Sequence, residues 1–323
     1  VPLALGLAYG WTAATALRRL SPLLLFVTFL ITLYCLLFII RPAYAIPDVV
    51  EMLPEEATDI GVEVGDGLTL LGAVVETETA EPGDPVWLTV YWQVDSVPEE
   101  PPAFTISIFG RELSEAAKLH SYHGRGLYPA SLWSLGSIVA DRFAVRLQDK
   151  IDAPVLGRIW AGIEDGAEGA DVGEVKIVPS RWVEASEPEL ARIVDVIALS
   201  KLELERDQVK AGEMIGLSVQ WHVISNPIRD LTTLVHLGQP DQPPLAVGDR
   251  PPKNGSYPTG VWQTGEVIED EYSLQIPVEL PAGRYPLWLG MYDSEDHVRA
   301  TIRVGGERQP RDVYLAGWLE IEE

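Results

Sequence analysis

The chain has 323 residues and a formal net charge of −24, from 48 Asp and Glu against 24 Lys and Arg. This excess of negative charge argues against nucleic acid as a partner, because the phosphate backbone would be repelled. The single cysteine, Cys35, lies within an apolar stretch, so the rest of the chain has no disulfide of its own and no Cys-ligated metal. We therefore expect domains held together by hydrophobic cores alone, with no cofactor.

The N-terminal part of the chain predicts a membrane anchor over residues 1–45. Residues 22–40 (PLLLFVTFLITLYCLLFII) carry no charge and match the length that a transmembrane helix needs, about 20 residues. Arg18 and Arg19 precede this stretch, and no Asp or Glu occurs before position 46. The positive-inside rule then places the N-terminal side in the cytoplasm and the rest of the chain outside the cell membrane. Membrane lipid is accordingly the first expected partner.

A secretory signal peptide is the alternative interpretation of the same stretch. Ala43-Tyr44-Ala45 has the small-x-small form of a cleavage site. The apolar core is longer than is usual in a signal peptide, and Arg41 separates it from the possible cleavage site. Both features favour the anchor, although cleavage after Ala45 stays open.

The remainder of the chain contains an internal repeat. Residues 128–133 (YPASLW) return 129 positions later as 257–262 (YPTGVW). The same offset places Gly83 on Gly212 and Trp92 on Trp221. A constant offset of this length indicates two tandem copies of one domain and excludes a solenoid of short repeats.

Each copy reads as a β-sandwich. Apolar residues alternate with other residues over 85–94 and again over 214–223, which is the period of a strand. Pro and Gly punctuate many short segments of this kind, and little helical periodicity appears apart from a short turn expected within 111–119. We predict a mostly β fold: an N-terminal transmembrane helix followed by two tandem antiparallel β-sandwiches, Ig-like or jelly-roll-like. The expected boundaries are a linker at 46–58, the first sandwich at 59–180, a second linker at 181–189 and the second sandwich at 190–323.

Together with the anchor, several motifs of the second copy resemble a known family. These motifs are Val235-His236-Leu237, Tyr257-Pro258-Thr259, Trp262-x-x-Gly265-Glu266, Asp270-x-Tyr272 and Pro281-x-Gly283-x-Tyr285. The chain resembles the C-terminal region, last membrane helix plus β-sandwich, of bacterial glycosyltransferase family 39 (dolichyl-phosphate-mannose-protein mannosyltransferase-like) membrane proteins of the Chloroflexi type. The first copy departs from the pattern, with Ser107, His120 and Ser137 where the second has His236, Asp249 and Glu266. The resemblance implies that the catalytic acids of such an enzyme lie in a region that this chain does not contain.

The repeated turn supplies the candidate ligand-binding residues. Sugars are held by aromatic faces flanked by carboxylates. The residues that could supply this set are Tyr128, Trp133 and Asp141 in the first copy and Tyr257, Trp262, Asp270, Asp249 and Glu266 in the second. The alternative is that the aromatic residues pin a long loop to the sandwich and the acids cap turns. Exposed aromatic rings would favour sugar binding, whereas burial of Trp133 and Trp262 would favour the structural role.

Other chemistry finds little support in the sequence. His120 and His123 form one close histidine pair, but no carboxylate lies between them, and a solvated loop explains them more simply than a metal does. No phosphate-binding loop, zinc-protease motif or serine elbow appears. We therefore predict neither catalytic nor metal-ligating residues.

These observations lead to one functional hypothesis with two alternatives. The first is a membrane-anchored, extracytoplasmic tandem β-sandwich that acts as a binding or interaction module without its own catalytic site, its partner being a cell-surface glycan or another envelope protein. The second is an accessory C-terminal part of a family 39-like glycosyltransferase. The third is a structural subunit of a cell-envelope assembly.

Overall fold

The computed structural model describes residues 25–40, 46–65, 67–99, 102–163 and 168–322. Residues 25–34 are α-helical and continue as the π-helix η1 (Cys35–Ile40). Large apolar side chains along this helix are exposed, among them Phe26, Phe29 and Phe38. Within the described ranges, no helix is both long enough and apolar enough to cross a membrane. The predicted span at 22–40 begins three residues before the first described residue, and most of the predicted anchor also lies outside the described residues.

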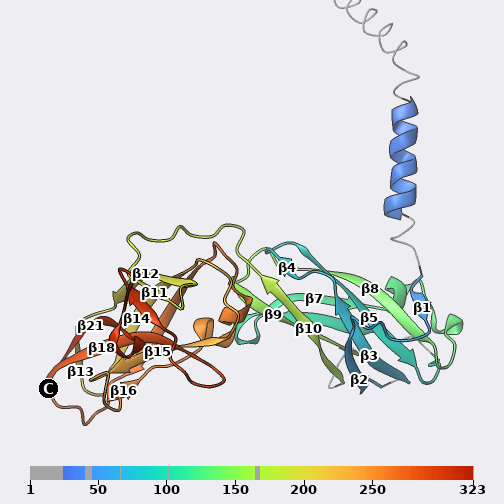
Figure 1. The fold of residues 1–323 in the computed structure, drawn as a ribbon. Coiled ribbons are helices and arrows are strands. Elements are labelled where there is room, and N and C mark those ends of the chain that lie inside the picture. Colours follow the sequence, from blue (N-terminus) through green and yellow to red (C-terminus); the bar gives the residue numbers. More distant parts are fainter. Residues whose placement is uncertain (1–24, 41–45, 66, 100–101, 164–167, 323) are drawn as a thin grey trace, which may run out of the picture.

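The first sandwich consists of two five-stranded sheets (Figure 1). One sheet has the order β1-β8-β5-β3-β2 and the other β4-β10-β9-β6-β7. The strands are β1 (Asp48–Val50), β2 (Thr58–Glu63), β3 (Leu68–Val75), β4 (Thr79–Ala80), β5 (Pro85–Val94), β6 (Phe104–Phe109), β7 (Glu115–Ser121), β8 (Ile138–Arg146), β9 (Val155–Ile163) and β10 (Gly169–Ile177). Short 3-10 turns interrupt the loops at η2 (Arg111–Leu113), η3 (His123–Gly126) and η4 (Ala130–Leu132).

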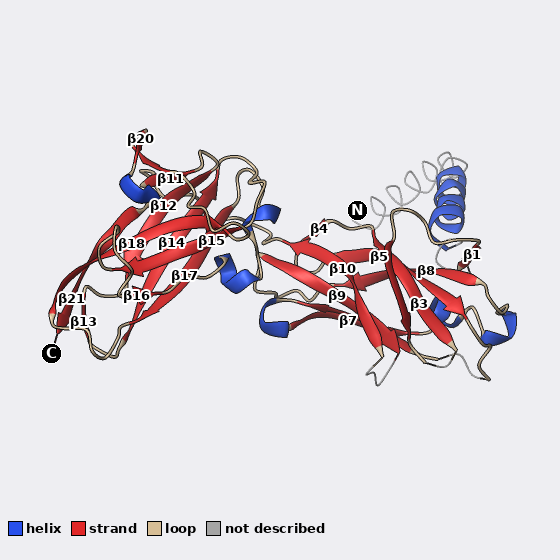
Figure 2. Cartoon of the chain, turned by 60° about the horizontal axis from the view of Figure 1, so that its bottom comes forward, coloured by secondary structure: helices blue, strands red, loops and turns tan. Residues whose placement is uncertain are grey.

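The second sandwich pairs a six-stranded sheet, β17-β14-β12-β11-β19-β20, with a five-stranded sheet, β13-β21-β18-β15-β16 (Figure 2). The strands are β11 (Ala191–Ile193), β12 (Ile197–Leu204), β13 (Gln208–Lys210), β14 (Met214–Val223), β15 (Leu231–Leu237), β16 (Ala246–Val247), β17 (Val267–Gln275), β18 (Gly283–Asp293), β19 (Ile302–Val304), β20 (Glu307–Arg308) and β21 (Tyr314–Glu322). Its 3-10 turns are η5 (Pro252–Gly255), η6 (Thr259–Val261) and η7 (Pro310–Asp312).

The sequence repeat is a repeat of topology. The run β8-β5-β3-β2 of the first sandwich corresponds to β17-β14-β12-β11 of the second, and β4-β10-β9-β6-β7 corresponds to β13-β21-β18-β15-β16. Two additions distinguish the copies. In the first, β1 pairs with the outer edge of β8, and in the second a hairpin, β19–β20, extends the sheet beyond β11.

Each sandwich has its own core, built by strand alternation. In β5 the side chains of Val86, Leu88, Val90, Trp92 and Val94 are all buried, as the period of two predicted. The equivalent strand β14 buries its own alternate set around Trp221. The two clusters of buried apolar residues share no member, so each copy holds apolar area sufficient for a domain of its own.

One expectation needs correction, and two can be made more specific. The sandwiches are not purely antiparallel, because β4 pairs in parallel with β10, and β13 with β21. In both cases the short strand joins the edge of one sheet, although the strands before and after it belong to the other sheet. A turn at Gly83 or Gly212 then leads into the next long strand, β5 or β14. The short helical turn expected within 111–119 is present as η2, and most of the remaining segment belongs to β7. The expected linker at 46–58 contains β1, because its backbone groups find hydrogen-bonding partners on β8.

Candidate functional site

The repeated aromatic turn folds back on itself in the same way in both copies. The indole N–H of Trp133 donates to the carbonyl oxygen of Tyr128 at 3.1 Å, and Trp262 donates to Tyr257 at 3.1 Å. The proline after each tyrosine has the extended backbone that precedes a 3-10 turn, η4 or η6. The sequence thus fixes a compact loop whose aromatic residues point back to the sandwich.

The four aromatic side chains are buried. Tyr128 and Trp133 are each 6% exposed, Tyr257 is 0% and Trp262 is 1% exposed. A sugar ring needs an accessible aromatic face on which to pack, and this arrangement offers none at these positions. The burial of both tryptophans meets the condition set for the structural role. Their part in ligand binding stays a prediction.

Asp141 and Asp270 stabilise a left-handed backbone turn. Asp141 Oδ2 accepts a hydrogen bond from the backbone N–H of Gly124 at 3.0 Å and lies 3.1 Å from His123 Nδ1. Asp270 Oδ2 accepts from the backbone N–H of Lys253 at 2.7 Å. Gly124 and Lys253 both have positive φ angles, 54° and 52°. Because an L-residue such as Lys253 rarely adopts this conformation, the Asp270 carboxylate supplies a compensating bond there, whereas Gly124 adopts it without strain.

Asp270 also binds a buried hydroxyl that the first copy lacks. The hydroxyl of Tyr272 donates to Asp270 Oδ2 at 2.7 Å, and it lies 2.8 Å from the hydroxyl of Thr233. Burial and the Asp270 carboxylate raise the pKa of Tyr272 well above its ordinary value. The first copy has Phe143 at this position, so the polar chain is a property of the second sandwich.

Asp249 ties the segment after β16 to strand β15. Its Oδ1 accepts the backbone N–H of Val235 at 2.8 Å, and its Oδ2 lies 3.0 Å from His236 Nε2. Both side chains are partly buried. Asp249 therefore lies on a different strand pair from the aromatic turn, and its carboxylate already has two partners.

Glu266 forms the centre of a junction between the two sandwiches. The ammonium group of Lys176, at the end of β10, lies 2.6 Å from Glu266 Oε1 and donates to the carbonyl oxygen of Val261 at 2.6 Å. The other oxygen of Glu266 accepts from the hydroxyl of Tyr257 at 2.8 Å and from the backbone N–H of Gln263 at 3.1 Å. The side chains of Lys176 and Glu266 are 7% and 6% exposed. This ion pair is thus buried and well supplied with hydrogen bonds.

Loss of one member of such a pair destabilises the fold more than loss of both. Removing one member of a buried ion pair leaves the other charge without compensation. Burial, reinforced by the Glu266 charge, raises the pKa of Tyr257 far above its ordinary value, so its hydroxyl stays a donor. The Lys176 ammonium also lies 5.6 Å from the centre of the Tyr257 ring, within the range of a cation–π contact. Two predicted ligand-binding residues therefore contact the first sandwich.

A second set of contacts flanks the first. Arg111 donates from Nε to the hydroxyl of Ser256 at 3.0 Å, from Nη1 to Asp152 at 2.7 Å and from Nη2 to the carbonyl of Pro154 at 3.1 Å. The backbone N–H of Leu156 donates to the carbonyl oxygen of Ser256 at 2.7 Å. Ser256 directly precedes the aromatic turn, so the bonds from Arg111 and Leu156 to Ser256 both hold the same loop of the second sandwich.

A polar groove of about 590 Å³ opens beside these contacts. Its walls come from η2 of the first sandwich and from β12, β14, β17 and η5 of the second. Burial, followed by the nearby Arg111 charge, lowers the pKa of Lys253 in this groove. Both cations and carboxylates line the walls, including Lys201, Arg250 and Glu269, so the groove has no dominant charge.

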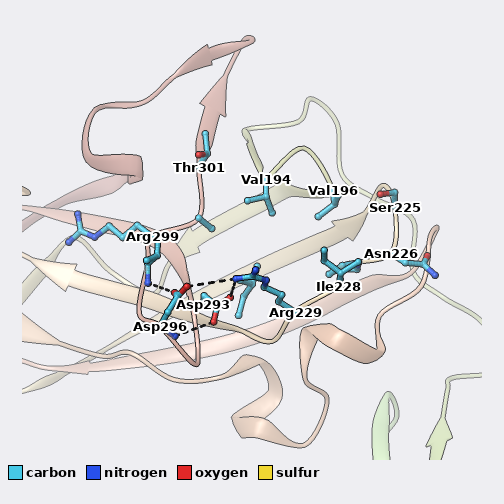
Figure 3. Close-up of a pocket in the computed structure, with 14 residues that line it drawn as sticks. Val194, Val196, Ser225, Asn226, Ile228, Arg229, Asp293, Asp296, Arg299 and Thr301 are labelled. Carbon is cyan, nitrogen blue, oxygen red and sulfur yellow. Dashed lines mark hydrogen bonds and ion pairs between the residues drawn. The ribbon is translucent and has the colours of Figure 1, made fainter.

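An apolar pocket of about 580 Å³ lies on the second sandwich (Figure 3). Val194 and Val196 line one side, and Arg229 lies near Asp293 and Asp296, with its Nη1 2.9 Å from Asp293 Oδ2 and 3.7 Å from Asp296 Oδ2. Ile228 at its margin is 94% exposed. Apolar walls with a few fixed polar groups are typical of binding sites.

Metal binding finds no support in the part of the chain that the structure describes. There, no group of three or more His, Cys, Asp or Glu side chains is arranged to hold an ion. His123, one of the two histidines weighed for this role, is enclosed by Trp92, Phe104 and Trp133, with ring centres 4.9 to 5.5 Å away. The expectation of a solvated loop is therefore wrong for His123, which is buried among aromatic side chains.

Comparison with known proteins assigns no family. No family model matches the chain, and no curated protein matches it. Among solved structures, red sea bream transglutaminase has 9% sequence identity and a TM-score of 0.24 over 78% of this chain. The chain spans 31% of that protein's length. The class that the structure itself defines is a tandem β-sandwich module.

Sequence reasoning found some residues of the junction and missed others. The sequence singles out Tyr257 as part of the repeat and Glu266 as a difference between the copies, in both cases as candidate ligand-binding residues and not as contacts between domains. Lys176 and Arg111 are not singled out, since a lysine or arginine at a strand end usually faces solvent. The structure shows which residue of the second copy corresponds to Lys176: Lys176 pairs with Thr79, and Glu320 pairs with Gln208, the residue equivalent to Thr79. Equivalent positions therefore carry a lysine in the first sandwich, where it contacts the second sandwich, and an exposed glutamate in the second.

Proposed function

We propose that this chain is an extracytoplasmic interaction arm, anchored through residues 22–40, in which two sandwiches act as one unit without a catalytic site of their own. The observation that carries the proposal is the buried contact of Lys176 with Glu266 and Val261. A flexible tandem array would leave these groups in water. Here Lys176 lies near the end of the last strand of the first sandwich, and Glu266 and Val261 of the second sandwich bind its ammonium group.

The second set of contacts also supports two sandwiches that act as one unit. Arg111 has three acceptors at the junction, one of them on Ser256 of the second sandwich. The backbone bond from Leu156 to Ser256 adds a link that does not depend on side-chain charge. Several independent bonds to one short loop restrict rotation between domains far more than a single linker does.

This arm differs from a sugar-binding module in how it uses the aromatic turn. A sugar site requires Tyr257 and Trp262 to be exposed, whereas in the arm both rings are buried and the Lys176 ammonium lies over the Tyr257 ring. A glycan array on the full chain, reconstituted in lipid nanodiscs, separates the two. Tyr257→Phe removes one buried hydroxyl and leaves the ring, so it is the appropriate variant, with Tyr314→Phe as a matched control.

We expect the Tyr257→Phe protein to show the same array profile as the wild type, whatever that profile is. Loss of a glycan signal in Tyr257→Phe but not in Tyr314→Phe, with the fold intact by circular dichroism, would contradict the arm and restore the sugar site.

The anchoring part of the proposal rests on the uncharged run at 22–40, the arginines at 18 and 19 and the exposed apolar side chains of the described helix. Alkaline extraction of membranes that contain the full chain tests it. We expect the chain to stay with the lipid fraction, and a Leu30→Lys, Leu33→Lys variant to be extracted.

The partner of the arm is proposed to be another envelope protein that contacts the apolar pocket of the second sandwich. Exposure of Ile228 next to an apolar recess supports this choice, because such surfaces commonly serve protein contacts. Crosslinking from a photoreactive residue at position 228 in intact cells is the test, with position 271 on the polar face as control.

The resemblance to family 39 glycosyltransferases adds a second candidate, in which the arm is the accessory part of a longer membrane enzyme. The motifs around Tyr257, Trp262 and Asp270, together with the apolar stretch, support it. The genomic sequence upstream of this chain is the test, since several membrane helices and a loop with paired acids would have to be encoded there.

A further inference from the structure

The two copies differ most at the tip of the aromatic turn. In the first copy the tip carries Leu127, Leu132 and Leu135, which are 40%, 56% and 72% exposed. The equivalent residues of the second copy are Ser256, Val261 and Thr264. In the second copy this end of the sandwich contacts the preceding domain, as Ser256 and Val261 do. The same end of the first copy therefore faces whatever precedes the first sandwich.

What precedes it in the chain is the apolar helix. Residues 25–40 are helical, and the chain is described again from Ile46. Pro47 then lies against the turn, because a Cβ added to Gly124 would come within 2.7 Å of its ring. β1 pairs with β8 directly afterwards. Figure 1 shows the helix, β1 and the green end of the first sandwich on the same side of the molecule.

The charge of this region also differs from the rest of the chain. Residues 116–140 contain no Asp or Glu, although the whole chain has a net charge of −24. Lys118 and Arg125 lie within the segment and are exposed. The equivalent residues of the second copy, 245–269, include Asp249, Glu266 and Glu269. A loop that has no acidic residue and exposes leucines and Arg125 complements an anionic lipid surface.

We infer that the tip of the first sandwich, formed by Leu127, Leu132, Leu135 and Arg125, rests in the interface of the lipid bilayer. The inference builds on the proposed anchor, which brings this end of the arm to the membrane. Leucine side chains at a loop tip partition into the interface, while Arg125 meets the head groups. The first sandwich is thereby seated on the membrane, and the rigid junction carries the second sandwich at a fixed position relative to it.

Depth measurements in nanodiscs of phosphatidylcholine and phosphatidylglycerol test this contact. In a Cys35→Ser background, Leu135→Cys is labelled with an environment-sensitive fluorophore, and lipids with a quencher on the acyl chain are added. Thr264→Cys, the equivalent site on the second sandwich, is the matched control. Leu30→Cys reports on the anchor itself.

We expect quenching and a blue shift at position 135, neither at position 264, and quenching at position 30. Quenching at 30 with none at 135 overturns the seated tip and leaves the anchor standing. Absence of quenching at 30 overturns the anchor, and the seated tip with it. A blue shift at 135 without lipid quenching means that a protein covers the tip, which also overturns the inference.

A second variant separates side-chain chemistry from position. Replacing the tip residues by those of the second copy, Leu127→Ser with Leu135→Thr, keeps the loop geometry that the second copy demonstrates. With the fluorophore moved to Leu132→Cys, we expect most of the quenching to disappear in this variant. Unchanged quenching would mean that the anchor alone brings the label close to lipid.

Discussion

The two sandwiches share one strand plan and differ at one end. In the first, the aromatic turn presents leucines to its surroundings and encloses His123 among aromatic rings. In the second, the same turn carries Glu266 and Ser256, both of which bind the first sandwich. A duplicated domain thus keeps its core and changes the end at which it meets its neighbour. The repeated motif marks a scaffold, and the differences within the motif mark the contacts.

The largest expected effect comes from the junction. Lys176→Ala should lower the free energy of unfolding by about 3–5 kcal/mol, because the buried Glu266 carboxylate loses its counter-charge. Urea denaturation measures this. The structurally equivalent Glu320→Ala should change stability by less than about 0.5 kcal/mol, because that side chain is exposed.

The double variant Lys176→Met with Glu266→Gln sharpens the interpretation. A neutral amide still accepts from Tyr257 and Gln263, so most of the lost stability should return. If the double variant is as unstable as Lys176→Ala, the loss reflects packing around the lysine stem and not an unpaired charge.

A smaller effect is expected from making the second core resemble the first. Tyr272→Phe introduces the residue found at Phe143 and removes the donor to Asp270. We expect a loss of about 1–3 kcal/mol, because Asp270 and Thr233 lose a buried partner. Tyr314→Phe serves as the control in the same denaturation series. Equal losses of stability in the two variants would mean that the hydrogen bond from Tyr272 to Asp270 does not stabilise the fold.

Alkaline pH provides a related test of the same residue. The pKa of Tyr272 in the folded protein is raised well above the ordinary value of 10.0, whereas the unfolded chain ionises normally. Unfolded chains therefore release a proton above pH 10 that the folded protein retains, and stability falls as pH rises. The wild type should lose about 1.4 kcal/mol more per pH unit than Tyr272→Phe above that point. Parallel stability curves for the two proteins would contradict this.

The smallest effect is expected at the tip of the first sandwich. Leu135→Thr should change the free energy of unfolding by less than about 0.5 kcal/mol, because the side chain is largely exposed. A substantial loss in urea denaturation would place Leu135 in the fold of the loop and not on its surface.

The sequence predicted those parts of the structure that depend on local pattern. Alternation around Trp92 and Trp221 located the central strands, and the constant offset located the two domains. The parallel edge strands β4 and β13 were not predicted, because strands of two or three residues are too short to show a period. The role of Glu266 could not be predicted, since Lys176 reaches it only after both domains fold and dock. The role of Asp270 could not be predicted either, because its partner is the backbone N–H of Lys253, which a left-handed turn directs toward the carboxylate.

The central claim is that the junction holds the two sandwiches in one arrangement. Pulsed dipolar spectroscopy between spin labels at Lys118→Cys and Ser273→Cys, in the Cys35→Ser background, measures this directly. We expect one narrow distance distribution for the otherwise wild-type protein and a broad one when Lys176→Ala is added. A broad distribution before that substitution, or a narrow one that survives it unchanged, would contradict the account.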